Sequence, residues 1–429
     1  MINKRTNFFI NSLIISLFLI GFTVGNSQAQ TRKRRTGIRQ ELMNKVLKRK
    51  YRKSTKKSPQ THLPFNRSVI ESQFASWGVK PSNKKSSINL IKAWKKYQNK
   101  KEIIVAVIDT GIDPKHPYLK NNIYTVSSKP TLTNYGKDFS KGSKKVNSPF
   151  DDHGHGTHVS GIIKSVFPKV KVLSLKYYNK NASGQDNLNS TVEALKYAVE
   201  NNVDIINYSG GGPEPALEEL RVLKKAEKKG ILVVAAAGNE ESNIDIKQNA
   251  YYPASYGLKN IITVTAHDKE LKMLRSSNWG QRSVDISAPG YNIKSSLPGL
   301  RAGTLTGTSQ ATAFVTGSAA LIMSQYPELS VEEIKNIIKV SAKKEITMTN
   351  KCSSGGRLDA GNAQNVAAEY VKKKNSRALA MKRKLSHKSI KSRADRNLAQ
   401  TITQDNFRNI GIQNKPGVII YRTEFRKRN

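Results

Sequence analysis

Three short polar motifs, far apart in the chain, contain the residue types needed for nucleophilic catalysis. They contribute Asp109, His155 and Ser309. An aspartate that orients a histidine, and a histidine that takes a proton from a serine, turn a weak hydroxyl into a nucleophile. Ser309 follows Gly307 at the start of a small-residue, apolar segment, 307–323, which predicts a buried helix. Free N–H groups and the helix dipole at its first turn suit a reaction that develops an oxyanion.

Each of these residues also has a purely structural interpretation. Ser309 taken alone is better explained as the cap of a core helix, Asp109 could be another helix cap, and His155 could be a satisfied polar residue. His155 and His158, with Asp152 nearby, have the residue types of a metal site, but no third ligand cluster stands at metal-like spacing. The presence of an acid, a base and a hydroxyl, each on its own loop or helix start, favours catalysis, and we predict no metal ligands.

The elements that position these residues alternate along the chain. Continuous apolar runs, typical of strands buried on both faces of a parallel sheet, lie at 103–108, 170–175, 203–206, 231–237 and 261–266. Between and after them, amphipathic segments predict helices at 156–166, 189–200, 216–228 and 331–341, the last with Ser330 and Glu333 as a capping box. This alternation predicts an α/β protein with three layers, α/β/α, and a mainly parallel central sheet. Asp109 follows the first strand, at the sheet edge where catalytic groups gather.

The order and local sequence of the motifs resemble those of the subtilisin-like serine proteases. The matching pieces are residues 107–113 (VIDTGID), 155–161 (HGTHVSG), 233–240 (VVAAAGNE), and 307–309 with 311–312 (GTS and AT). The similarity covers about residues 77–363, and four independent motifs in the same order make it highly specific. It implies a subtilisin-like sheet and hydrolysis of peptide bonds.

The resemblance also implies a role for each catalytic residue. Ser309 would attack the scissile carbonyl, His155 would take its proton and return it to the leaving amine, and Asp109 would orient and stabilise the imidazolium. The side-chain amide of Asn239 and the backbone N–H of Ser309 would bind the oxyanion. Loss of one such donor typically raises the barrier by about 3 kcal/mol.

Two further segments match the substrate-binding regions of the family. Ser209, Gly210, Gly211 and Gly212 match the strand whose backbone pairs with an extended peptide, although a plain glycine-rich turn would have the same composition. Tyr251 lies in the segment that matches the floor of the primary specificity pocket, where many members have a small residue. Its bulk predicts a shallow pocket that prefers small or medium side chains before the cut.

The chain departs from the family pattern at several positions. Gln310 replaces the usual Met after the nucleophile and Ala313 replaces a usual Pro, and neither change removes a catalytic group. Many members bind calcium through an acid in a His-Pro-Asp-Leu stretch and through a long loop after the histidine helix. Here the first stretch, 116–119, reads HPYL, and residues 166–170 lead directly into the next strand. We therefore expect the calcium site to be missing, and no other cofactor is evident.

Composition divides the chain into four parts. Residues 1–29 have the positive start, apolar stretch and small-residue cleavage site of a secretory signal peptide, with an uncleaved anchor as the alternative. Residues 30–70 form a basic segment, read as disordered or as a short propeptide, and residues 71–365 form the catalytic domain. Residues 366–429 form a basic C-terminal tail. No other stretch is apolar enough to span a membrane.

The net charge of +42 is concentrated in the flanking segments. Residues 32–57 contain 13 Lys or Arg and one Glu, and residues 371–429 contain 17 Lys or Arg and three acids. Such segments are usually solvated, and they could also bind an anionic cell envelope or nucleic acid.

The sequence therefore predicts an exported serine endopeptidase, periplasmic or extracellular, that acts on polypeptides through an acyl-enzyme. The alternative hypothesis is that the protein is a binding protein and not an efficient enzyme: a catalytically weak subtilase-like protein that serves in attachment or in binding anionic polymers.

Overall fold

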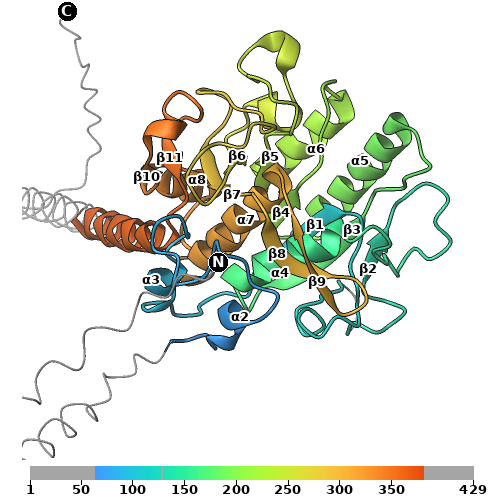
Figure 1. Cartoon of the computed structure of the whole chain (residues 1–429), viewed down its shortest axis with the longest axis horizontal. Coiled ribbons are helices and arrows are strands. Elements are labelled where there is room, and N and C mark those ends of the chain that lie inside the picture. The colour runs from blue at the N-terminus through green and yellow to red at the C-terminus, as the bar shows by residue number, and fades with distance from the viewer. Residues whose placement is uncertain (1–62, 127–128, 381–429) are drawn as a thin grey trace, which may run out of the picture. The chain divides into compact units, whose positions relative to one another are not determined.

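The computed structural model describes residues 63–126 and 129–380. Its main element is a nine-stranded sheet with the order β10-β11-β7-β6-β5-β4-β1-β3-β2 (Figure 1). The strands are β1 (Ile104–Asp109), β2 (Gly136–Asp138), β3 (Lys171–Lys176), β4 (Ile205–Tyr208), β5 (Leu232–Ala236), β6 (Ile261–His267), β7 (Ile286–Pro289), β10 (Lys343–Lys344) and β11 (Gly356–Arg357).

All neighbouring strands of this sheet are parallel except β10 and β11, which pair antiparallel. β1 lies between β3 and β4, so the chain builds outward from β1 in both directions. The carboxyl end of such a strand opens onto the crevice where α/β proteins place their sites. A separate antiparallel hairpin is formed by β8 (Ile293–Leu297) and β9 (Arg301–Leu305).

Successive residues of β1 pack into different halves of the core. Val105 and Val107 join the cluster on one face of the sheet, and Ala106 and Ile108 join the cluster on the other. Because side chains alternate along a strand, both faces must be apolar when both are covered. This explains why the strands read in the sequence as continuous apolar runs and not as an alternating pattern.

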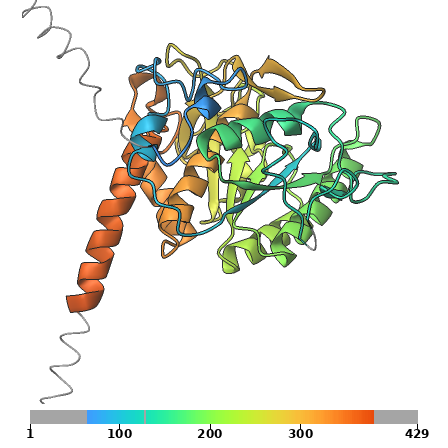
Figure 2. The same ribbon diagram turned by 90° about the horizontal axis from the view of Figure 1, so that it is seen from below.

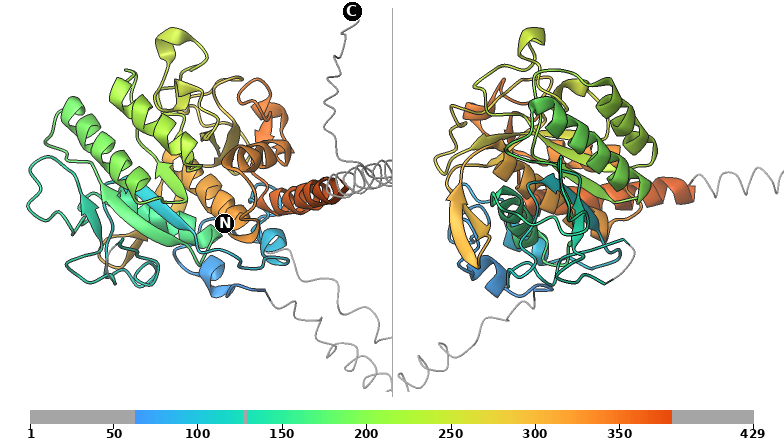
Figure 3. Two further views of the ribbon diagram at one scale, coloured as in Figure 1. Left: turned by 180° about the vertical axis from the view of Figure 1, so that it is seen from behind. Right: turned by 90° about the vertical axis from the view of Figure 1, so that its right-hand side faces the viewer.

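Helices cover the sheet on both faces. α4 (His155–Val166) and α7 (Thr308–Gln325) pack together on one face, and α5 (Gly184–Glu200) and α6 (Leu217–Lys228) pack together on the other (Figure 3). Every residue of α7 is buried, as predicted for a segment made mostly of small residues and without a charged side chain. The three-layer α/β/α prediction is thus confirmed.

The predicted elements match the structure closely, and the differences have local causes. The capping box of α8 (Val331–Val340) is confirmed, with Ser330 accepting from the Glu333 N–H. α5 begins at Gly184 and not near residue 189, because Ser183 and Asp186 form a second capping box that the polar sequence concealed. The short strands β2 and β7 to β11 were not predicted, since few of their residues form an apolar run.

Packing extends past both expected ends of the domain. Near residue 71, α2 (Ser68–Glu71) and the preceding residues contribute buried Ile70 and Phe65 to the core, ahead of α3 (Leu90–Trp94). After residue 365, a helix over 360–380 continues, and its last turns project from the domain in red-orange (Figure 2). No helix in the described part of the chain has the length and apolar character needed to cross a bilayer. The predicted signal peptide, most of the basic N-terminal segment and residues 381–429 lie outside the described residues.

Candidate active site

Asp109 and His155 meet where β1 ends and α4 begins. The Asp109 Oδ1 and Oδ2 atoms lie 2.8 and 3.0 Å from His155 Nδ1. The carboxylate is only 3% exposed, and Oδ1 also accepts the backbone N–H of Thr110 at 2.7 Å. Because Nδ1 faces the carboxylate, the Nε2 atom of His155 is the one left to exchange a proton with another group.

Asp151, fully buried, fastens the end of β1 to the start of α4. It accepts the hydroxyl of Thr110 at 2.7 Å, and the backbone N–H groups of Gly154 and Thr157 at 2.7 and 2.8 Å. Thr110 Oγ1 in turn accepts the N–H of Gly156 at 2.9 Å. A side chain at Gly156 would collide with the backbone below it, so only glycine allows this approach. This aspartate was not predicted from the sequence, because its partner Thr110 lies 41 positions away in the chain.

The environment of His155 favours its charged form. Burial disfavours the imidazolium, but the negative charge of Asp109, its hydrogen bond to the ring and the charge of Asp151 outweigh burial, so the pKa of His155 is raised. His158, one turn later, has the opposite balance. Burial and the neighbouring His155 lower the pKa of His158 to about 4, and its Nε2 lies 2.9 Å from the carbonyl of Ile293.

Ser309 is the second residue of α7, and it reaches the sheet edge beside Asp109. Its Oγ donates to the carbonyl of Ser209 at 3.1 Å, and within the described residues it makes no hydrogen bond to His155. Ser209 directly follows Tyr208, which pairs with Ile108 across β4 and β1. The serine and aspartate motifs therefore converge on adjacent strand ends, although they are 200 positions apart in the chain.

Asn239 follows β5 and is held against the start of α7. Its Oδ1 accepts the backbone N–H of Thr308 at 3.0 Å and lies 3.2 Å from the Thr308 hydroxyl. With the oxygen engaged in this way, the amide Nδ2 is the end that remains available as a donor. Gly307, which starts this turn, has a φ of 153°.

The segment of Ser209, Gly210, Gly211 and Gly212 continues from β4 as partly exposed backbone. Gly212 exchanges two backbone hydrogen bonds with Tyr252, at 3.0 and 2.8 Å. These bonds join the two segments predicted to bind substrate, and within the described part of the chain residues 209–212 make no other backbone–backbone hydrogen bond.

Tyr251 lies between the glycine segment and the loop that carries Asn239. An atom in the Cβ position of Gly211 would lie 2.5 Å from the Tyr251 ring, and one on Gly238 would lie 3.1 Å from it. The ring thus touches the backbone of both segments. Burial and then the charge of Glu240 raise the pKa of the Tyr251 hydroxyl far above its usual range, so the side chain is a neutral phenol.

The two segments in which we expected no calcium site, 116–119 and 166–170, lie close together in the structure. Polar side chains next to each segment donate to backbone carbonyls of the other. The Lys164 ammonium donates to the carbonyl of Tyr118 and lies 4.7 Å from the centre of its ring. Asn122 Nδ2 donates to the carbonyls of Pro168 and Val170, both at 2.8 Å. Among the described residues, no group of three or more His, Cys, Asp or Glu side chains could hold a metal ion.

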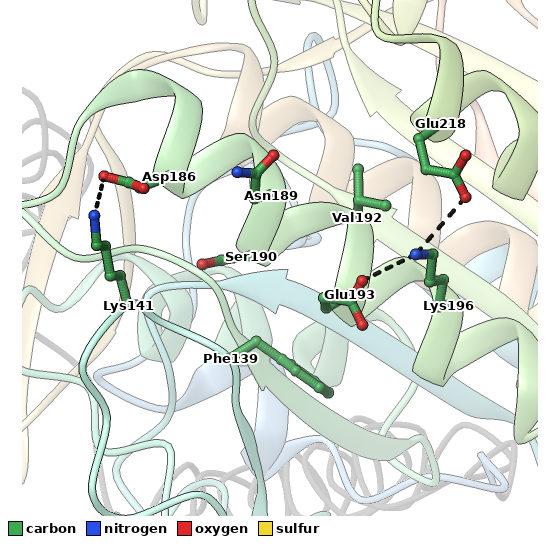
Figure 4. Close-up of a pocket in the computed structure, with 9 residues that line it drawn as sticks. All are labelled: Phe139, Lys141, Asp186, Asn189, Ser190, Val192, Glu193, Lys196 and Glu218. Carbon is green, nitrogen blue, oxygen red and sulfur yellow. Dashed lines mark hydrogen bonds and ion pairs between the residues drawn. The ribbon is translucent and has the colours of Figure 1, made fainter.

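A hollow of about 440 Å³ lies elsewhere, along α5 (Figure 4). Its charged side chains neutralise one another: Lys141 pairs with Asp186 at 2.9 Å, and Lys196 pairs with Glu193 and Glu218 at 2.9 and 3.7 Å. None of the predicted site residues lines it. The hollow is therefore distinct from the strand ends where the three motifs converge.

A mainly parallel sheet, with an Asp–His pair at one strand end and a serine at the start of a buried helix beside it, is the architecture of a hydrolase site. The chain matches the model of the subtilase family over residues 100–371, and it belongs to that family. It is therefore a subtilisin-like serine endopeptidase.

Individual relatives agree with this assignment. The chain is 38% identical to the major intracellular serine protease of Bacillus subtilis over 255 residues, which is 56% of this chain and 75% of that protein. It is 32% identical to a thermostable alkaline protease of Halalkalibacterium halodurans, over 71% of this chain and 77% of the relative. It is 35% identical to subtilisin amylosacchariticus of Bacillus subtilis subsp. amylosacchariticus, over 56% of this chain and 60% of the relative.

The electrostatics of His155 give a direct prediction. An NMR titration of the imidazole signals should give His155 a pKa above the ordinary value of about 6.5, because the negative charge of Asp109 holds the proton. Asp109→Asn removes that charge and leaves the burial, so the same signal should then titrate below about 6.5. His158 serves as the internal control, with a pKa well below both. An unchanged His155 pKa in Asp109→Asn would contradict the electrostatic account.

Proposed function

We propose that this endopeptidase works through Asp109, His155 and Ser309, with Asn239 as an oxyanion donor. The observation that carries the proposal is the Asp109–His155 hydrogen bond at 2.8 Å at the end of β1. The neighbouring strand β4 ends next to Ser209, whose carbonyl accepts the hydrogen bond from the Ser309 hydroxyl. Asp109, His155 and Asn239 are held by backbone or buried groups, so these three residues need little reorganisation when a substrate binds.

The reaction follows from these positions. Ser309 Oγ forms a bond to the scissile carbonyl carbon while His155 Nε2 takes the hydroxyl proton, and Asp109 stabilises the resulting imidazolium. The carbonyl oxygen, now negative, is bound by Asn239 Nδ2 and the N–H of Ser309. His155 then gives the proton to the leaving amine, the C–N bond breaks, and water hydrolyses the ester by the same route.

Ser309 must turn during this cycle. Its Oγ donates to the Ser209 carbonyl in the free protein, so rotation about its Cα–Cβ bond brings the hydroxyl towards His155 as the substrate enters. Catalytic hydrogen bonds often tighten only in the substrate complex. We infer that the Ser209 carbonyl is a resting position for the nucleophile.

A fluorophosphonate probe tests the nucleophile. The wild-type protein should be labelled, and Ser309→Ala should lose both labelling and essentially all peptide hydrolysis, with only the residual rate that binding and the oxyanion donors supply. Ser318→Ala, a buried serine in the same helix whose hydroxyl donates to the Phe314 carbonyl, is the matched control and should still be labelled. A folded wild-type protein that resists the probe would instead favour the attachment or binding function.

We also propose that the substrate lies along residues 209–212 and that Tyr251 limits its primary pocket. The open backbone edge of this segment can pair with an extended peptide. The Tyr251 ring touches Gly211 and Gly238, and so fills space between the two segments that would otherwise receive a side chain. Small or medium residues before the cut fit the remaining space.

The pocket proposal predicts a change of specificity. Tyr251→Gly should shift the preference in kcat/KM towards large aromatic residues before the cut by about 10- to 200-fold, the range that pocket volume typically controls. Tyr251→Phe keeps the ring and should leave the profile within about twofold. A peptide library in which the wild type already prefers large aromatics would refute the proposal.

We propose further that this domain does not need calcium where many family members hold it. Lys164 puts a positive charge at the Tyr118 carbonyl, and Asn122 occupies the carbonyls of the short loop after α4. These are donors, whereas calcium needs oxygen ligands. Burial lowers the pKa of Lys164 to about 8, and at neutral pH it is still mostly charged.

Chelation tests this directly. An excess of a calcium chelator should change the melting temperature by less than about 1 °C, because a bound ligand at 100 times its Kd stabilises by about 2.7 kcal/mol and its loss would be obvious. Added calcium should be equally without effect. A fall of several degrees on chelation would refute the proposal.

The flanking segments support two proposals, one about the location of the protein and one about its binding to anionic partners. We propose export, directed by residues 1–29, although one relative is named an intracellular protease. Mass spectrometry of the mature termini distinguishes an exported protein, which has lost residues 1–29, from an intracellular one.

We also propose that the basic flanks bind anionic envelope or nucleic acid, since Lys372, Lys373 and Arg377 are exposed on the projecting helix. Binding to an anionic polymer should then collapse with added salt.

A further inference from the structure

The loop that carries Asn239 has no regular structure of its own. It runs from Ala237 to Ser242, directly after β5, and two of its residues have positive φ, 101° at Gly238 and 54° at Glu241. Asn239 itself is exposed. A catalytic donor on such a loop needs an external support, because a displacement of about 1 Å can lower a rate about 100-fold.

That support is the side chain of Asn278, which is only 1% exposed and comes from the connection between β6 and β7. Its Nδ2 donates to the Ala237 carbonyl at 2.9 Å and to Glu240 Oε2 at 2.5 Å. Its Oδ1 accepts the backbone N–H groups of Glu240 and Ser242, both at 3.0 Å. Both donors and both acceptor positions of the amide are therefore used.

The backbone of Asn278 adds a fifth bond to the same loop. Its N–H donates to the Gly238 carbonyl at 3.0 Å, and its own carbonyl accepts the hydroxyl of Thr265 in β6 at 2.8 Å. A side chain on Gly238 would collide with Asn278 Nδ2 and with Glu240. The loop is thus wound tightly around one buried amide that is anchored to the central sheet.

We propose that Asn278 is a positioning residue for peptide hydrolysis, and that it acts through Asn239. Asn278 fixes residues 237, 238, 240 and 242, so the backbone on both sides of Asn239 is held, while Thr308 holds the Asn239 side chain from α7. Together these contacts aim the Asn239 amide at the oxyanion. The inference rests on the proposed role of Asn239.

The chemistry of the site requires an amide at position 278. An aspartate keeps the two acceptor bonds but loses both donors, and it places its charge against Glu240 and the Ala237 carbonyl. Asn278→Asp is therefore nearly isosteric and disrupts the loop electrostatically. Glu240→Gln supplies a neutral donor opposite the new carboxylate, and should restore the missing hydrogen bond with reversed polarity.

A double-mutant cycle tests the proposal, with kcat and KM measured per active site by burst titration. Asn278→Asp should lower kcat about 10- to 100-fold and change KM less than about threefold. In the Asn239→Ala background the same substitution should lower kcat by less than about twofold, because the donor it positions is gone. Glu240→Gln should recover at least about fivefold of kcat in Asn278→Asp, and should cost little alone.

The contrary outcomes are distinct. If Asn278→Asp folds and keeps kcat within twofold, Asn278 is structural and the inference fails. The inference also fails if Asn278→Asp lowers kcat by the same factor in the Asn239→Ala background as in the wild type. If Asn239→Ala itself leaves kcat unchanged, the proposed oxyanion role fails instead. Should Asn278→Asp not fold, Thr265→Val replaces it. Thr265→Val removes the hydroxyl that donates to the Asn278 carbonyl. It should lower kcat less than Asn278→Asp does, and this effect should also disappear in the Asn239→Ala background.

Discussion

The site depends on the burial of two carboxylates at the end of one central strand. A buried charge is costly unless it is paired or fully hydrogen-bonded. Asp109 meets this requirement with the His155 ring and the Thr110 N–H, and Asp151 meets it with a hydroxyl and backbone N–H groups from the start of α4. The same bonds that compensate the charges also fix the histidine and raise its pKa. The position of His155 and its raised pKa therefore both result from the same two carboxylates, Asp109 and Asp151.

The serine depends on a different constraint, the close packing of α7. The helix passes through the core, and small residues let it approach its neighbours. A Cβ atom on Gly317 would lie 2.6 Å from the Cβ atom of Val166 in α4. Larger residues would push α7 away from α4, and Ser309 would move away from the strand end where Asp109 lies. The composition of this helix thus sets the position of its first turn.

Much of this could be predicted because it is local. The apolar runs identified the central strands, and the small-residue segment identified α7. The short polar motifs identified Asp109, His155, Ser309 and Asn239 as candidates. The supports could not be predicted, because their partners are distant in sequence: the amide at position 278 binds a loop 38 positions away. Nor does the sequence reveal that the serine hydroxyl bonds to Ser209, since that is a choice among side-chain rotamers.

Two departures from the family pattern lie where we propose that ligands bind or would be expected to bind. Tyr251 fills volume beside the glycine segment, and Lys164 places its ammonium at the Tyr118 carbonyl, in the stretch where we propose that calcium is not needed. By contrast, the groups that move protons are held by backbone atoms and buried polar side chains, which tolerate few substitutions. If the proposed roles hold, the substrate preference of this protein can differ from that of its relatives while the reaction stays the same, and it has to be derived from Tyr251 and the glycine segment.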